Sequence, residues 1–373
     1  MATLDQAAAN YVPATARSSI PYNSNLHYLR GIASLLVVLS HSGFYLNSYL
    51  GDAWAAAIFP DQFGLYGVAI FFAISGYLMA TLITKERPTD FLARRIVRIY
   101  PTFLLCTAFT MLVLFPQVIQ RWVPLSVTLA PMDDATYLMR VEWTIVHEIF
   151  FYLVVFCFAT FGIQRWVPVF AVIWIVVLIA AAYLRIPMPA IGRANIGAIG
   201  LMSANVGFAA GLLIPTILKR LSNPLLGVSI FVTFLFTQYN FSAVYVRVFA
   251  GIGSAFLIVS ALQRPVNPPR VVHLALTKLG DWSYAIYLIH VPILTYIFTV
   301  YRGENTPWFA WPVATALALA MGALLGEIDQ VLTEKGKSLV KGSSLKVLNV
   351  AAVTFIAVYL GAAVLSLIFN LAS

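Results

Sequence analysis

Eleven long apolar runs constrain the fold of this 373-residue chain more than any other feature. Each run is close to the ~20 residues that an α-helix needs to cross the hydrocarbon core of a bilayer. The runs are 28–49, 63–84, 100–116, 143–162, 167–184, 197–218, 224–239, 243–262, 279–300, 308–326 and 347–371. Hydrophobic residues make up 61% of the sequence and charged residues only 10%. The sequence therefore predicts an all-α, polytopic transmembrane helix bundle of about 10–11 helices.

The distribution of Lys and Arg predicts how this bundle is oriented. With the N-terminus cytoplasmic and the loops alternating sides, sixteen of these residues fall inside and five outside, and Arg30 and Arg247 lie within apolar runs. This excess satisfies the positive-inside rule, so the net charge of +9 is assigned to topology and no nucleic-acid partner is expected. We expect residues 1–27 to form a polar cytoplasmic tail and residues 28–373 a multi-pass domain in the inner (plasma) membrane.

No connection between the runs is long enough for an independent folded domain. The longest predicted connections are 85–99, 117–142 and 327–346. The Pro-rich segment 264–270 is typical of an extended linker. Cys106 and Cys157 lie within apolar runs and suggest neither a disulfide framework nor a metal site. Any chemistry is therefore expected in the helices or at their ends.

Arg30 and His41 lie eleven positions apart in the first run. Eleven steps of a helix come to three turns plus roughly 20°, so both side chains share one face, about 16 Å apart along the axis. Ionisable groups at membrane depth are functional candidates. The alternative is that Arg30 anchors the helix end to lipid headgroups and that His41 is a core histidine satisfied by a polar neighbour.

Glu148 lies about five residues below the predicted outer end of the fourth run, at a depth similar to that of His41. A carboxylate beside an imidazole suits a general base, because it orients the ring and stabilises the imidazolium that forms. A purely structural Glu–His bond between helices is the alternative. His147 is a further candidate for either role, although it points roughly 100° away from Glu148 on the same helix.

Three arginines gather at the predicted cytoplasmic end of the third run: Arg94, Arg95 and Arg98. Their helical spacing and the predicted depth of Arg30 suggest one anion site built from all four, because guanidinium forks match phosphate oxygens in pairs. Binding of anionic lipid headgroups by the cluster is the alternative.

Five segments, in order along the chain, resemble the membrane-bound acyltransferase-3 family. They are the Arg30-x10-His41 pair, Phe71–Leu78 (FFAISGYL), Arg95–Pro101 (RIVRIYP), Trp143–Glu148 (WTIVHE) and Leu279–Pro292 (LGDWSYAIYLIHVP). The sequence departs from the family pattern at His147, a position where relatives often carry Glu or another polar residue. This departure leaves open which side chain is the partner of His41.

This resemblance implies an O-acyltransferase that takes an acyl group, most often acetyl, from cytoplasmic acyl-CoA. The implied acceptor is a hydroxyl of an extracytoplasmic glycan such as exopolysaccharide or lipopolysaccharide. The four arginines would hold the CoA phosphates, and His41, backed by Glu148, would deprotonate the hydroxyl or carry the acyl group itself. Polar residues expected to line the passage are Ser75, His147, Ser283, Tyr284 and His290, although Ser283 and Tyr284 fit interhelical hydrogen bonding equally well.

Two other classes of protein use the same residues differently. A transporter or flippase would bind an anionic or glycan-linked substrate through the Arg and His side chains, although no repeated half is visible in the sequence. A scaffold or sensor without turnover would tolerate the loss of His41.

Overall fold

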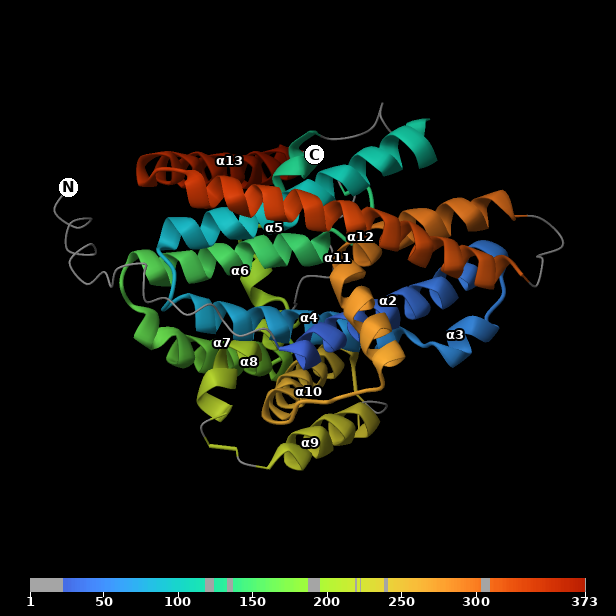
Figure 1. The fold of residues 1–373 in the computed structure, drawn as a ribbon, viewed down its shortest axis with the longest axis horizontal. Helices are drawn as coiled ribbons and strands as arrows, with labels where there is room; N and C mark the ends of the chain where they lie inside the picture. Colours follow the sequence, from blue (N-terminus) through green and yellow to red (C-terminus); the bar gives the residue numbers. More distant parts are fainter. Residues whose placement is uncertain are drawn as a thin grey trace.

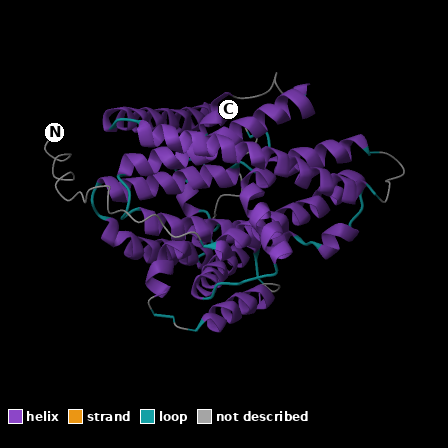
Figure 2. Cartoon of the chain, in the orientation of Figure 1, coloured by secondary structure: helices purple, strands orange, loops and turns teal. Residues whose placement is uncertain are grey.

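A computed structural model describes residues 23–117, 124–132, 137–186, 195–218, 220–221, 223–237, 241–302 and 309–372. Within these residues the chain forms twelve α-helices and no strand, which confirms the predicted all-α class (Figure 2). Of the predicted polar tail 1–27, residues 1–22 lie outside the described residues. The first described helix begins at Ser24, within the last part of that predicted tail.

The helices follow the apolar runs in order. Their bounds are α2 Ser24–Leu50, α3 Trp54–Ile58, α4 Asp61–Leu82, α5 Pro88–Phe109, α6 Trp143–Thr160, α7 Val167–Tyr183, α8 Asn205–Leu218, α9 Pro224–Thr237, α10 Ala243–Gln263, α11 Arg270–Val300, α12 Ala310–Gly342 and α13 Leu345–Ala372. Short π or 3₁₀ turns are η2 Thr110–Leu114, η4 Pro124–Thr128, η6 Gln164–Trp166 and η7 Ile199–Leu201. Among the described residues, nine helices are long and apolar enough to span a bilayer, and two shorter apolar helices, α8 and α9, complete the set of eleven runs. The chain is a multi-pass membrane protein.

The centre of the bundle is built around α2, α4, α8 and α11. Helix α11 packs against both α2 and α12, while α4 packs against α2 and α8. In Figure 1, α12 and α13 run along one edge of the molecule and α9 along the opposite edge. Many large apolar side chains of α7, α9 and α13 are exposed, as expected for helices that face lipid acyl chains.

Small residues allow the closest contact in this centre, between α4 and α8. A Cβ atom built on Gly76 would lie 2.2 Å from the carbonyl oxygen of Phe208, and one built on Gly211 would lie 2.3 Å from that of Ala73. Both separations are far below van der Waals contact, so glycine is required on each helix. Such close approach of backbones is the usual way in which helices associate inside a membrane.

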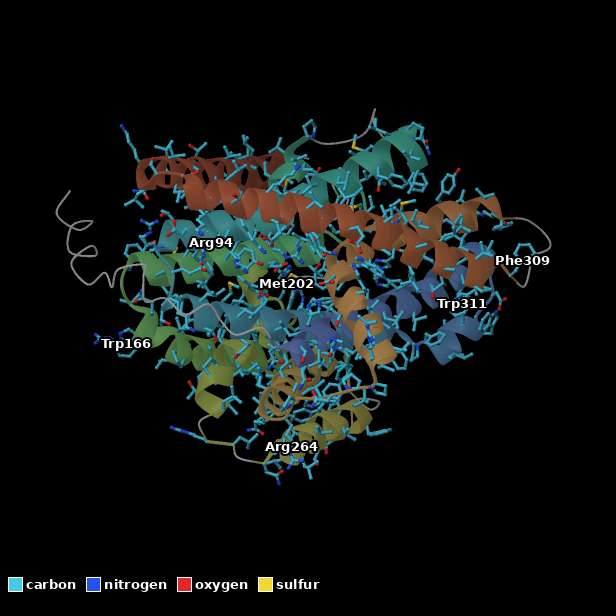
Figure 3. The ribbon with its side chains drawn as sticks, in the orientation of Figure 1. Arg94, Trp166, Met202, Arg264, Phe309 and Trp311 are labelled. Atoms are coloured by element: carbon cyan, nitrogen blue, oxygen red, sulfur yellow. The ribbon has the colours of Figure 1, made fainter. Side chains whose placement is uncertain are left out.

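The two ends of the bundle are marked by different contacts. At one end, Asn25 donates to the carbonyl oxygens of Ala261 (2.7 Å) and Arg264 (2.6 Å), which ties the start of α2 to the end of α10. At the other end, the indole nitrogen of Trp311 donates to Ser42 Oγ at 3.0 Å. Figure 3 shows Phe309 and Trp311 at one end of the long axis and Trp166 and Arg94 toward the other. Arg94, one of the residues that the charge count places inside, thus lies away from the Trp311 end.

Two predicted connections turned out to be helical. Helix α5 begins at Pro88, inside the predicted connection 85–99, and α12 continues to Gly342 through most of the predicted connection 327–346. Polarity alone suggested loops there. Instead, the polar turns of α12 are stabilised by a buried carboxylate at Asp329 and by a Glu334–Lys337 ion pair at 2.6 Å. The predicted extended linker before Arg270 is confirmed, because no regular element lies between Arg264 and Arg270.

The segment before α6 enters the bundle instead of staying at its outer surface. Leu129, Met132, Met139 and Val141 are all buried, and Glu142, which directly precedes α6, is 2% exposed. Helix α6 therefore begins inside the protein. The depth of Glu148 in the membrane, counted from an outer end at residue 142, stays a prediction.

Candidate functional site

Two cavities lie inside the bundle, and most of the predicted site residues line one or the other. The first, here called the arginine cavity, is about 110 Å³ in volume and is lined by Arg30, Arg95, Arg98, Glu148 and Tyr284 among others. The second, the histidine cavity, is about 300 Å³ and is lined by His41, Arg247, Asp61, Tyr45 and Trp143 among others. Val68 and Tyr287 line both cavities, so the two share a wall.

Arg98 is fixed in the arginine cavity by a carboxylate that the sequence analysis missed. Arg98 Nη1 donates to Asp329 Oδ2 at 2.8 Å, and the guanidinium lies 5.0 Å from the centre of the Tyr284 ring. Asp329 is only 1% exposed and also accepts hydrogen bonds from the hydroxyls of Thr102 and Thr333. A charged pair at this depth is stable when each group is satisfied in this way.

The arginine cavity carries a surplus of positive charge. Arg30 and Arg95 have no ion-pair partner within the described part of the chain, in contrast to Arg98. The Glu148 carboxylate acts electrostatically on Arg30 and Arg98 and accepts a hydrogen bond from the hydroxyl of Tyr152. Three guanidinium groups thus face two carboxylates, Glu148 and Asp329. This arrangement suits an anionic ligand.

Ser75 adds a neutral donor to the same cavity. Its hydroxyl is buried and has no hydrogen-bond partner among the described residues. Such unsatisfied buried groups are rare, and a ligand in the cavity would supply the missing partner.

Arg94 does not join the other three arginines. Its Nη1 donates to Glu86 Oε1 at 2.8 Å, and its side chain is not part of the cavity lining. Adjacent residues of a helix point about 100° apart, so Arg94 faces the preceding turn while Arg95 faces the cavity. The predicted four-arginine cluster is corrected to Arg30, Arg95 and Arg98.

His41 is paired with His290. His41 Nδ1 lies 2.8 Å from His290 Nε2, and His290 Nδ1 lies 2.7 Å from the carbonyl oxygen of Tyr287. A carbonyl oxygen only accepts, so neutral His290 carries its proton on Nδ1 and accepts through Nε2. His41 therefore holds its own proton on Nδ1. Its Nε2 is left with a lone pair, which is the form a general base requires.

The predicted pairing of His41 with Glu148 is wrong. Glu148 lines the arginine cavity and not the histidine cavity, and the hydrogen-bond partner of His41 is His290. Only Trp143, at the start of α6, reaches the histidine cavity from this helix. Glu148 is a neighbour of the arginines.

Two other predicted lining residues have structural contacts instead. His147 is buried, with Nδ1 2.6 Å from the carbonyl oxygen of Trp143 and Nε2 3.1 Å from Met202 Sδ. Met202 is labelled near the middle of the molecule in Figure 3. Ser283 donates to the carbonyl oxygen of Gly280 at 2.7 Å within α11. Neither side chain lines a cavity. Tyr284 and Ser75 do line one, and His290 reaches the histidine cavity only through His41.

Tyr287 forms the wall between the cavities. Its hydroxyl lies 2.9 Å from Thr144 Oγ1, and its ring packs against those of Phe71 and His290. Tyr287 belongs to the Leu279–Pro292 segment that carries the family resemblance, but it was not among the predicted site residues. Asp329 could have been noticed as an acidic residue near the end of an apolar run, but it fell in a segment predicted to be a loop. Within the described residues no group of three or more His, Cys, Asp or Glu side chains is placed to hold a metal ion.

Comparison with known proteins identifies the class to which this bundle belongs. A family model described as an acyltransferase domain matches residues 23–327, which include all residues that line the two cavities. The chain is a member of the acyltransferase-3 family of membrane proteins, as its sequence motifs predicted. It is 23% identical over 350 residues to Acyltransferase MdmB of Streptomyces mycarofaciens, an alignment that covers 82% of this chain and 87% of that protein. No solved structure matches the chain significantly.

Proposed function

We propose that this acyltransferase moves an acyl group, most simply acetyl, from cytoplasmic acyl-CoA to a hydroxyl of an extracytoplasmic glycan. The arginine cavity would hold the phosphates of CoA through Arg30, Arg95 and Arg98, with the thioester directed toward Tyr287. The acceptor hydroxyl would enter the histidine cavity. The observation that carries the proposal is the shared wall at Tyr287 and Val68, which brings an anion-binding cavity next to a histidine held in the basic tautomer.

The reaction follows from the protonation states of the histidine pair. His41 Nε2 takes the proton of the acceptor hydroxyl as its oxygen attacks the thioester carbonyl. The tetrahedral intermediate collapses with cleavage of the C–S bond, and the CoA thiolate leaves with the proton from His41 Nε2. His41 Nδ1–H remains bonded to His290 throughout, so the ring keeps its orientation. The products are an ester and free CoA.

The orientation in the inner (plasma) membrane rests on the charge count. Basic residues gather before and at the start of α5, after α10 and in the last turns of α12, so these ends would face the cytoplasm, where acyl-CoA is found. The histidine cavity would then open toward the outside, where an exopolysaccharide, a lipopolysaccharide or a similar glycan is available.

Acyl transfer by the purified protein tests the proposal directly. Detergent-purified protein with acetyl-CoA should release CoA in the presence of acceptor glycan, and His41→Gln should abolish this release. His273→Gln is a matched control, because His273 lies on the exposed start of α11 and lines neither cavity. Mass spectrometry of surface glycans with and without the intact gene would identify the acceptor. Equal release by the parent protein and a folded His41→Gln variant would refute the assignment.

A further inference from the structure

The histidine cavity contains a cation that the proposed chemistry does not use. Arg247 lies in the second turn of α10, half-buried, and its side chain lines the cavity together with His41. Two large neighbours, Trp143 and Tyr45, give the cavity aromatic walls. A volume of about 300 Å³ is at the lower end of the range for small-molecule sites.

Arg247, like Arg30 and Arg95, has no ion-pair partner among the described residues, but it is the arginine that lines the histidine cavity. Arg98 pairs with Asp329 and Arg94 with Glu86, whereas no carboxylate of the described residues lies within ion-pair distance of Arg247. Asp61 lines the same cavity but sits at the exposed first turn of α4 and is not paired with Arg247. A guanidinium removed from water without a partner is costly, which favours a ligand that supplies the missing negative charge.

We propose that Arg247 binds an anionic group of the acceptor, so that the enzyme selects an acidic acceptor over a neutral one. The inference rests on the proposed function, since it takes the histidine cavity as the acceptor site. A carboxylate or a phosphate, each matched by the two parallel N–H bonds of a guanidinium, would be held by Arg247. The hydroxyl to be acylated would lie elsewhere on the same molecule, beside His41 Nε2.

The two sources of such an anion are a sugar carboxylate and a sugar phosphate. Both share the chemistry that a guanidinium recognises, and they differ in charge and in geometry. The test therefore uses D-glucuronate, glucose 1-phosphate and, as the neutral counterpart, glucose. Tighter binding of glucuronate assigns the carboxylate, and tighter binding of glucose 1-phosphate assigns the phosphate; either supports an anion site.

Binding of these three compounds to the full-length, detergent-purified protein is measured by titration calorimetry. Saturating CoA is included to occupy the arginine cavity, so that the sugars do not bind there. An Arg98→Ala variant is measured in parallel, and a loss of sugar binding in this variant would indicate binding in the arginine cavity. In the parent protein at least one of the two anions should bind saturably and glucose should not. Arg247→Gln should weaken that binding on the order of tenfold or more, as expected for loss of charge-assisted hydrogen bonds.

Three further variants sharpen the result. Arg247→Lys should weaken binding less than Arg247→Gln does, because it keeps the charge but loses the paired N–H bonds. Asp61→Asn should not weaken it. Arg302→Gln is the matched control, since Arg302 is exposed and lines neither cavity. The melting temperature of each variant without ligand confirms that it is folded.

The proposal is overturned if neither anion binds, if glucose binds as tightly as the anions, or if Arg247→Gln leaves anion binding unchanged. None of these measurements needs turnover. A failure of acyl transfer would therefore be distinguished from a failure of the anion site.

Discussion

His41 Nδ1 and His290 Nε2 lie 2.8 Å apart, although the two residues are 249 positions apart in the sequence. His290 is completely buried, and its other nitrogen is held by a backbone carbonyl of the same helix. The pair fixes one tautomer of His41, in which Nε2 carries the lone pair that the proposed acceptor hydroxyl would meet. In this arrangement His290 takes the place that a carboxylate occupies in other general-base sites.

Replacing His290 by Gln should lower the rate of acyl transfer by a factor on the order of 10²–10⁴, because His41 would lose its fixed tautomer and orientation. The affinity for acyl-CoA should stay within about twofold, since His290 does not reach the arginine cavity. Single-turnover acylation and donor binding measure the two effects. The pH dependence of the rate should also change, which a purely structural residue would not cause. An unaltered pH profile and an unaltered rate would contradict the positioning role.

Asp329→Asn should weaken donor binding through Arg98. The variant removes the charge that holds the Arg98 guanidinium in the cavity, and we expect the KM for acyl-CoA to rise on the order of tenfold with a small change in kcat. Glu334→Gln, on an exposed turn of the same helix, is the matched control. A kcat that falls while KM stays constant would show that Asp329 acts elsewhere.

Glu148→Gln should leave CoA binding as tight as in the parent or make it a few-fold tighter. Removing this carboxylate increases the positive charge around Arg30 and Arg98, which favours phosphate. Arg98→Ala should do the opposite and weaken binding on the order of tenfold or more. Equilibrium binding of CoA to both variants is the measurement. Loss of CoA binding in Glu148→Gln would mean that the carboxylate itself contacts the donor.

Gly76→Ala should destabilise the bundle by about 1–3 kcal/mol or more, because the added methyl group meets the backbone of α8 at 2.2 Å. Gly361→Ala on α13 is the matched control, because a Cβ there meets nothing within 4 Å. Thermal unfolding in detergent compares the two variants. Equal melting temperatures would show that α4 and α8 are less tightly packed than described.

The sequence by itself determined the class of fold and the chemical character of the site. Apolar runs of membrane-spanning length have one stable solution in lipid, in which every backbone group is paired within a helix, so eleven runs became eleven apolar helices. The helical spacing of Arg95 and Arg98 also predicted that the two side chains lie close together on one helix, where they could bind phosphate. These properties depend on residues close together in the chain.

The tertiary structure decided which of those residues work together. His41 meets His290 of α11, whereas Glu148 of α6 lines the other cavity, and only the packing of these helices against one another separates the two. Whether Arg98 is free or anchored depends on the length of α12, which carries Asp329 across from α5. Local periodicity contains no information on such long-range contacts, because helix depth and rotation are fixed only when side chains from distant segments fill the same interior.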